Sequence, residues 1–218
     1  MSGSGEGDAD ARPGFLDAGL GEEFPGLGLR YLTVDRGSGR STKALKQRLR
    51  ILSDRFAGPQ AINLRQRPIP WAYRVFFRHI GLDPDEQRTP VEEIALERMK
   101  KGGFVSQNLL DDALTIAIME SGVALRAFDA DRAEPPIGIR PTTADERLEG
   151  RPGALPRGTL VIADQRRPLA LLFGAIGSGR GVDKGTGRIL LCAIQVQGVP
   201  EIAVEEALWL AREALQTA

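Results

Sequence analysis

The hydrophobic pattern of residues 108–122 predicts a helix that is apolar on nearly every side. The run reads N-L-L-D-D-A-L-T-I-A-I-M-E-S-G, with polar residues gathered at its two ends. A helix that is hydrophobic all round lies inside a protein rather than on its surface. Asn108 is placed to cap this helix and Gly122 to end it, before the extended piece A-L-R-A-F-D. We therefore expect a buried helix whose polar ends could border a pocket.

Residues 43–56 form a second periodic segment, which predicts an amphipathic helix capped by Ser41 or Thr42. Large hydrophobic residues recur along one face: Leu45, Leu49, Leu52 and Phe56. Cations occupy another face: Lys43, Lys46 and Arg50. We expect this helix to pack against the core and still present a row of positive charge.

The remaining elements are predicted from shorter patterns. A strand is expected over residues 27–35, and three more helices over residues 71–79, 90–101 and 204–215. Short strands are expected over residues 137–141, 159–164, 168–174 and 188–196. The prolines of residues 58–70 predict a loop. Four aromatic residues near the helix 71–79 favour core packing over base stacking: Trp71, Tyr73, Phe76 and Phe77.

Helices that come first and strands that come later predict the α+β class, with packed helices and a mixed or antiparallel sheet. We expect one domain over residues 23–218, because 218 residues suffice for one large core. Residues 1–22 are rich in Gly, Ser, Asp and Glu and are expected to be a disordered tail.

The composition narrows the chemistry. Cys192 is the only cysteine and lies in an apolar run, which favours a buried reduced thiol over a nucleophile. His79 is the only histidine, which argues against a zinc site and against a Ser-His-Asp triad. We expect neither a metal nor a cofactor. With no apolar run of about 18 residues and no signal-peptide pattern, we also expect no membrane contact and a cytoplasmic location.

A formal net charge of zero conceals a basic segment. Residues 30–80 hold twelve Arg or Lys and two acids, so their local net charge is +10 (12 − 2). Such a distribution is typical of a footprint for a polyanion. The candidate nucleic-acid-binding residues are Arg40, Lys43, Lys46 and Arg50. The alternative is that the cations of this segment find acidic partners elsewhere in the fold.

Three motifs together resemble one known family. The first is the run from Asn108 to Asp129 described above. The second comprises L-V-I-A-D (160–164), P-L-A-L (168–171) and G-A-I-G (174–177). The third is Y-R-V-F-F-R-H-I-G-L-D-P from Tyr73, followed by R-T-P-V-E-E-I and R-M-K-K-G-G. Together they resemble the B3/4 editing domain of the phenylalanyl-tRNA synthetase beta chain. The third motif points to the free-standing proteins of this type, and the resemblance runs from about Phe24 to the C-terminus.

The departures from the family pattern bear on the ligand. Thr115 stands at the asparagine of the family's D-x-T-N motif, whose threonine is Leu114 here. Arg126 stands at its histidine, and Arg180 falls at or near its glutamate. These changes argue against tyrosine editing of the synthetase kind. If both arginines converge as the family fold implies, the pocket mouth is cationic and suits a carboxylate or phosphate. The alternative is that they form surface ion pairs with Asp129, Asp131 or Asp183.

The resemblance implies these candidate ligand-binding residues: Asn108, Asp112, Thr115, Glu120, Arg126, Asp129, Gly177, Ser178 and Arg180. A structural alternative exists for Asp112, because acids stabilise the first turn of a helix. Glu120 opposes the helix dipole, so it is either paired with a cation or functional. The glycine-rich residues 174–187 lack a G-K-[ST] motif and precede a strand, which favours a hairpin loop over a phosphate loop.

We therefore expect a protein that binds tRNA or an aminoacyl-type ligand. Hydrolysis of mischarged aminoacyl-tRNA in trans is a candidate activity, since an activated ester needs only positioning and electrostatic help. Water would be held by polar groups such as Thr115, Ser178 and Glu120, but no catalytic residue is assigned. The competing hypothesis is a non-catalytic module that binds a small anionic ligand or a protein partner through the former editing pocket.

Overall fold

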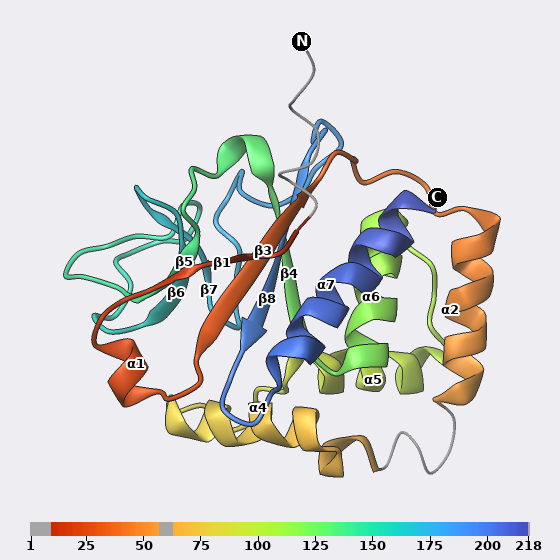
Figure 1. Ribbon diagram of the computed structural model, residues 1–218, viewed down its shortest axis with the longest axis horizontal. Coiled ribbons are helices and arrows are strands. Elements are labelled where there is room, and N and C mark those ends of the chain that lie inside the picture. The colour runs from red at the N-terminus through yellow and green to blue at the C-terminus, as the bar shows by residue number, and fades with distance from the viewer. Residues whose placement is uncertain (1–9, 57–62, 218) are drawn as a thin grey trace. The chain divides into compact units, whose positions relative to one another are not determined.

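The computed structural model describes residues 10–56 and 63–217, which fall into two compact units (Figure 1). The first unit contains the described residues within 1–37 and 126–192. The second unit contains the described residues within 38–125 and 193–218. Strands dominate the first unit and helices the second, which confirms the predicted α+β class.

The strands form two four-stranded sheets. One has the order β1 (Arg12–Pro13), β3 (Gly28–Val34), β8 (Ile189–Gln195) and β4 (Ala124–Asp129). The other has the order β2 (Phe15–Leu16), β5 (Gly138–Pro141), β6 (Leu160–Ala163) and β7 (Pro168–Leu171). The second sheet is mixed, because β2 pairs parallel to β5 while β5, β6 and β7 pair antiparallel. The short helix α1 (Leu20–Glu23) and the 3-10 turn η2 (Ala130–Arg132) also belong to the first unit.

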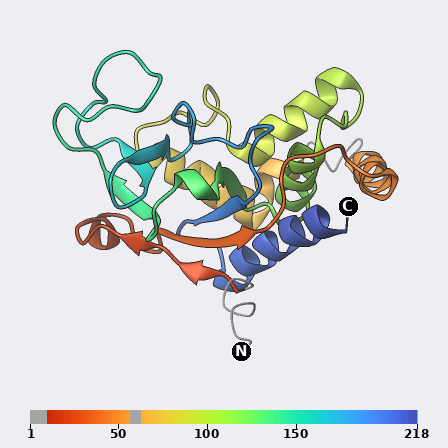
Figure 2. The same ribbon diagram turned by 90° about the horizontal axis from the view of Figure 1, so that it is seen from above.

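Helices make up most of the second unit. They are α2 (Lys43–Arg55), the 3-10 turn η1 (Asn63–Gln66), α4 (Pro68–His79), α5 (Pro90–Lys101), α6 (Leu109–Ser121) and α7 (Glu201–Gln216). Figure 2 shows α6 between α5 and α7, with α2 alongside. Ala113, Ile116 and Ala117 of α6 are fully buried. The prediction of a buried helix that is apolar on all sides is therefore confirmed.

The predicted caps of α6 and α2 are also present. The Asn108 side-chain oxygen accepts a hydrogen bond from the Asp111 amide at 2.9 Å, and Gly122 ends α6 with φ 78°. Thr42, rather than Ser41, caps α2 by accepting from the Leu45 amide at 3.2 Å. The hydrophobic face of α2 is buried as predicted: Leu45, Leu49, Leu52 and Phe56.

Two helices begin earlier than the patterns predicted. Helix α4 starts at Pro68, inside the predicted loop 58–70, of which residues 58–62 lie outside the described residues. Proline is tolerated in the first turn because its missing N–H would have no partner within the helix. Helix α7 starts at Glu201, directly after Pro200. Residue patterns alone gave the apolar cores of these helices but missed their first turns.

The N-terminal segment also differs from expectation. The predicted disordered tail, residues 1–22, lies outside the described residues only as far as residue 9. From Arg12 onward the chain forms β1, β2 and α1, because its backbone pairs with other strands. Arg12 pairs with Tyr31 in β3, and Phe15 pairs with Gly138 in β5. The amino-acid composition of residues 1–22 could not predict that this segment pairs with strands far away in the sequence.

The aromatic residues of α4 are divided between core and surface. Tyr73, Phe76 and Phe77 are buried, as core packing predicts, whereas Trp71 is 50% exposed. Arg78 lies over the Trp71 ring, 5.9 Å from its centroid. The Tyr73 hydroxyl donates to the Ile194 carbonyl and accepts from the Ala124 amide at 3.0 Å. The prediction of core packing was therefore wrong for Trp71 alone among the four.

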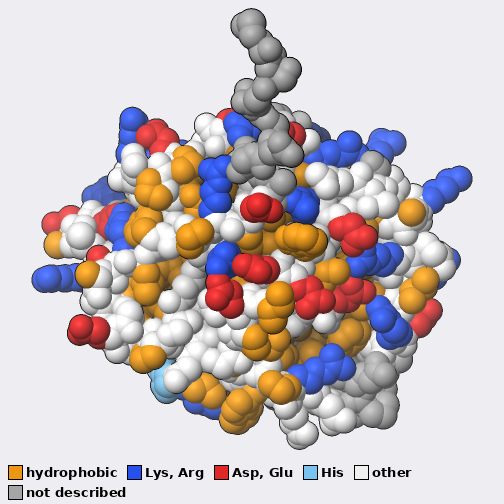
Figure 3. Space-filling view, viewed as in Figure 1, with side chains coloured by type: hydrophobic (Ala, Val, Ile, Leu, Met, Phe, Trp, Pro, Cys, Tyr) orange, Lys and Arg blue, Asp and Glu red, His pale blue; other side chains and the backbone are white. Residues whose placement is uncertain are grey.

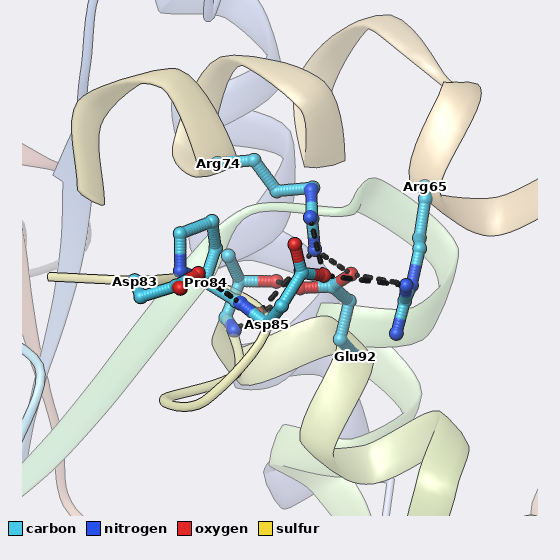
Figure 4. Close-up of polar contacts among 7 residues, drawn as sticks. Arg65, Arg74, Asp83, Pro84, Asp85 and Glu92 are labelled. Atoms are coloured by element: carbon cyan, nitrogen blue, oxygen red, sulfur yellow. Dashed lines mark hydrogen bonds and ion pairs between the residues drawn. The ribbon is translucent and has the colours of Figure 1, made fainter. Parts of the chain in front are cut away.

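A buried ion pair joins α4 to α5 (Figure 4). Arg74 and Glu92 are each 4% exposed, and their side chains lie 2.7 Å apart. Arg65 approaches the same Glu92 oxygen at 3.0 Å, and Arg74 also reaches Asp85 at 2.7 Å. The second Glu92 oxygen accepts from Thr89 in a capping box at the start of α5. This network contains Arg74 and Glu92 of the third sequence motif and gives them a structural role.

We predict that Arg74→Met lowers the free energy of unfolding by about 3–5 kcal/mol, because it leaves the buried Glu92 carboxylate without its main partner. Urea unfolding at neutral pH measures this effect. The matched control is Glu97→Ala, which breaks only the exposed pairs with Lys100 and Lys101 and should leave stability nearly unchanged. Equal effects of the two substitutions would contradict the assigned role of the network.

Candidate functional site

The polar start of α6 is a closed hydrogen-bond cluster in the second unit. Asp112 is 2% exposed and accepts from Ser41 and Ser106 at 2.5 Å each and from the Gln107 amide at 2.9 Å. Since its oxygens already have three donors, Asp112 anchors the preceding segments against α6. The serines were not among the sequence candidates, because no local pattern links residue 41 to residue 112.

The side chain of Asn108 likewise forms hydrogen bonds with neighbouring residues. Its side-chain oxygen accepts from the Asp111 amide at 2.9 Å and from the Ser38 hydroxyl at 3.0 Å. Its side-chain nitrogen donates to the Asp111 carboxylate at 2.6 Å. Capping therefore accounts for the polar groups of Asn108.

Thr115 and Glu120 line different hollows of the second unit. Thr115 is half-buried beside a hollow of about 230 Å³ that is shared with α5 and residues 103–107. Glu120 borders a mainly apolar hollow of about 400 Å³ with residues 64–70 and 198–200. Arg48 and Arg55 of α2 bind the Glu120 carboxylate at 2.7 and 3.0 Å. Of the two roles expected for Glu120, the structure shows pairing with cations.

In the first unit, Arg180 is held by an acid that the sequence did not single out. Its guanidinium binds both carboxylate oxygens of Glu149, at 2.7 and 3.0 Å, and Arg167 reaches Glu149 at 2.8 Å. These two arginines, Arg180 foremost, lower the pKa of Glu149 to about 2. The alternative of an ion pair thus holds for Arg180, but its partner is Glu149 rather than Asp129, Asp131 or Asp183. Asp183 pairs instead with Arg132, and Asp131 with Arg188.

Arg126 lies within β4 and Asp129 at its end. Arg126 donates to the Gly174 carbonyl at 2.5 Å, so its guanidinium has a different partner from that of Arg180. Asp129 is 4% exposed and accepts from the Thr186 hydroxyl at 2.7 Å. Its amide donates to the Arg180 carbonyl at 3.0 Å. The structure thus brings Asp129 close to the backbone of Arg180. A cationic pocket mouth formed by both Arg126 and Arg180 stays a prediction.

Gly177 and Ser178 lie in the connection between β7 and β8. Because β7 and β8 belong to different sheets, this connection is not the predicted hairpin loop. Gly177 is buried and donates to the Leu169 carbonyl at 2.8 Å, and a Cβ added there would lie 3.2 Å from the same oxygen. Ser178 is exposed, and its amide donates to the Glu149 carbonyl at 2.7 Å. The small residues therefore permit close packing of this connection.

Eight of the twelve cations of residues 30–80 fall into a paired and an exposed group, while Arg67 and Arg78 are exposed and lie over the rings of Phe56 and Trp71. Among the described residues, four arginines form ion pairs with acids of the same unit: Arg48, Arg55, Arg65 and Arg74. Four other cations are exposed and have no acidic partner within residues 10–56 and 63–217: Arg40, Lys43, Lys46 and Arg50. The last three project from the exposed face of α2. We call these four residues the α2 cation row.

The remaining features to consider are the cysteine, possible metal ligands and possible membrane-spanning helices. Cys192 is buried as predicted, and burial raises the pKa of its thiol. Within residues 10–56 and 63–217, no three His, Cys, Asp or Glu side chains are grouped for a metal ion. Across that same part of the chain, no helix is long and apolar enough to cross a membrane.

Comparison with known proteins identifies the family. The sequence profile of the B3/4 domain family matches residues 72–205, which is more than half of the chain. The chain belongs to the B3/4 domain family. Its curated relatives include phenylalanine–tRNA ligase beta subunits, of which that of Xanthomonas oryzae pv. oryzae is 38% identical over 94 residues. Those of Photorhabdus laumondii and Xylella fastidiosa are each 35% identical, over 103 and 100 residues.

The B3/4 chain matches only a small part of these ligase subunits. Each match covers 42–44% of this chain and 12–13% of the relative. The family match includes all nine ligand candidates, from Asn108 to Arg180, but not the residues of the α2 cation row. The cation row is therefore a feature of this chain that the family match does not describe.

We predict that Glu149→Gln destabilises the protein at pH 7 and much less at pH 3. The pKa of Glu149 is lowered from 4.5 to about 2, so the ionised side chain stabilises the fold above about pH 4.5. That contribution falls as the pH drops toward 2. Urea midpoints of both proteins at the two pH values measure the difference. A difference that stays constant with pH would contradict the assigned ion pairs.

Proposed function

We propose that this chain binds tRNA through the α2 cation row. The observation that carries the proposal is the division of cations in residues 30–80. Internal ion pairs account for Arg48, Arg55, Arg65 and Arg74, but they do not account for the row. Exposed cations on one helix face are suited to phosphate oxygens, which supply most of the affinity in sequence-independent nucleic-acid binding.

The spacing of the row suits an extended polyanion. Lys43, Lys46 and Arg50 recur at i, i+3 and i+7, so they lie on one side of α2. With a rise of 1.5 Å per residue, they extend over roughly 10 Å along the helix axis. The opposite face is fixed by its buried leucines, and Arg98 of α5 donates to the Ser53 carbonyl near the end of α2 at 2.8 and 3.1 Å. The row is thus presented by an anchored helix.

The family relationship supports tRNA as the polyanion. The curated relatives are phenylalanine–tRNA ligase beta subunits, whose name includes tRNA as a substrate. The competing hypothesis, a module for a small anionic ligand, has less support, because Arg180 is already neutralised by Glu149.

We predict that the triple variant Lys43→Ala, Lys46→Ala, Arg50→Ala weakens tRNA binding and lowers its salt dependence. Each phosphate contact contributes about 0.7–0.9 to the slope of log affinity against log salt, so the slope should fall by about 2–3. Filter binding or fluorescence anisotropy at several salt concentrations measures both quantities.

A matched control removes the same charge elsewhere. Arg147, Arg151 and Arg157 are exposed arginines between β5 and β6 in the first unit. Their triple alanine variant should bind tRNA nearly as the unmodified protein does. If both triple variants lose affinity and slope equally, binding follows total charge and the assignment to α2 is wrong.

Hydrolysis of mischarged aminoacyl-tRNA in trans is a second candidate function. The observation that favours it is that the family match, residues 72–205, includes all nine candidate ligand residues. In this reaction a water attacks the ester carbonyl, and the products are the free amino acid and the tRNA 3′-terminal hydroxyl. The polar groups of the site would position the water and the ester.

We predict selective release of one amino acid from a panel of correctly and wrongly charged tRNAs. Arg126→Ala should reduce that release, because Arg126 is expected to bind an anionic part of the substrate. Arg180→Ala serves as a comparison, since its guanidinium already binds Glu149. Scintillation counting of precipitated tRNA follows the reaction. Absence of release from every tRNA would exclude hydrolysis while leaving the tRNA-binding proposal to its own test.

A further inference from the structure

Trp71 is a large aromatic side chain that the packing of the second unit leaves on the surface. It lies in the first turn of α4 and is 50% exposed, whereas Tyr73, Phe76 and Phe77 of the same helix are buried. The guanidinium of Arg78 lies 5.9 Å from the centroid of its ring. Core packing therefore does not account for an indole at this position.

The exposed side of α4 places a second arginine in line with that ring. Arg67, Trp71 and Arg78 are all exposed and are separated by four and seven residues, so they lie along one side of the helix. The Arg67 guanidinium lies 5.3 Å from the centroid of the Phe56 ring, which is 6% exposed. The three residues extend over roughly 16 Å along the helix axis. We call Arg67, Trp71 and Arg78 the α4 platform.

The sequence around the α4 platform has cations and no acids. Residues 55–82 contain five arginines and neither Asp nor Glu, so their local net charge is +5 (5 − 0). Within the part of the chain that the structure describes, Arg67 and Arg78 form no ion pair with an acid, and each lies over an aromatic ring instead. The platform is therefore an exposed indole between two cations.

Two acids lie near the ends of the platform, and arginines outside it already bind them. Asp85 is within electrostatic reach of Arg78, but Arg74 binds its carboxylate at 2.7 Å. Glu120 borders the same hollow as Arg67, but two arginines of α2 bind its carboxylate at 2.7 and 3.0 Å. The charge of both platform arginines is therefore available to an anionic ligand.

The second tryptophan of the chain has a similar exposure in a different electrostatic setting. Trp209 of α7 is 56% exposed, and the Arg212 guanidinium lies 5.3 Å from the centroid of its ring. Three acids lie within four residues of it on the same helix: Glu205, Glu206 and Glu213. Figure 3 shows acidic and hydrophobic side chains intermixed over the face on which α7 runs. Because these acids repel phosphates, charge complementarity to a nucleic acid favours Trp71 over Trp209.

We propose that the α4 platform binds an unpaired nucleotide of RNA, with its base stacked on Trp71 and its neighbouring phosphates bound by Arg67 and Arg78. A flat aromatic ring can stack on any base, and arginines beside it bind the backbone of a single strand. A paired base is already stacked within its own helix, so the platform selects unpaired nucleotides. The proposal rests on the proposed tRNA binding for its choice of polyanion and adds a contact to the bases.

Tryptophan fluorescence tests the stacking directly. Trp209→Phe leaves Trp71 as the only tryptophan. A short single-stranded oligoadenylate should quench its emission in a saturable way, because a stacked base quenches the indole. Inorganic polyphosphate, which has the charge but no base, and an RNA duplex should not quench it. No quenching by the oligoadenylate, or equal quenching by polyphosphate or by the duplex, would overturn the proposal.

Substitutions of Trp71 should change the affinity for the same oligoadenylate. Trp71→Ala should raise its dissociation constant at least about fivefold, the lower end of what one stacked base contributes. Trp71→Phe retains a ring and should keep most of the affinity, and the matched control Trp209→Ala should leave it unchanged. Fluorescence anisotropy of a labelled oligoadenylate measures binding, and circular dichroism checks that each variant is folded. Equal effects of Trp71→Ala and Trp209→Ala would contradict a specific site on α4.

The two nucleic-acid proposals fail in different ways. The α2 cation row is judged by the salt slope of its triple alanine variant, which leaves Trp71 in place. If tRNA binds with the expected slope but oligoadenylate does not quench Trp71, the row stands and the platform is excluded. If oligoadenylate quenches Trp71 but the triple variant keeps its slope and its affinity for tRNA, the platform stands and the row is wrong.

Discussion

Helix α6 cannot expose any of its sides to water without cost, because its apolar side chains point in nearly every direction. The second unit is arranged around that constraint, with α2, α5 and α7 packed against α6. The polar groups at the ends of α6 are used to secure it. Asp112 accepts hydrogen bonds from Ser41 and Ser106, which both precede α6, and Glu120 binds two arginines of α2. Polar residues that suggested a ligand site in the sequence therefore serve first to hold this helix in place.

The packing of α2 and α7 against α6 also determines which of their side chains face outward. Helix α2 gives its leucines to the core, so its remaining cations face water once Arg48 and Arg55 are paired with Glu120. Helix α7 gives its small and aliphatic residues to α6, yet it retains Trp209 and Ile202 outside. One outer face is cationic, and the other has exposed hydrophobic side chains. The tRNA-binding proposal thus rests on α2 side chains that the packing of α6 leaves exposed.

Local patterns predicted the elements well and the tertiary contacts poorly. The periodicity of Leu45, Leu49 and Leu52 and the caps at Asn108 and Gly122 report local geometry, so α2 and α6 could be placed from sequence. The partner of Arg180 could not, because Glu149 is 31 residues away and no spacing rule links the two. The Arg74–Glu92 pair lay within a recognised motif, but its burial depends on how α4 and α5 pack. Family resemblance supplied the fold type, while the roles of individual residues depend on contacts between segments far apart in the sequence.

The salt dependence of tRNA affinity for the unmodified protein tests the central claim most directly. If the α2 cation row contacts phosphates, a plot of log affinity against log salt between about 50 and 200 mM should be linear with a slope of about −2.8 to −3.6, since the row has four cations at 0.7–0.9 each. A slope near zero, or no measurable affinity at the lowest salt concentration, would contradict the account.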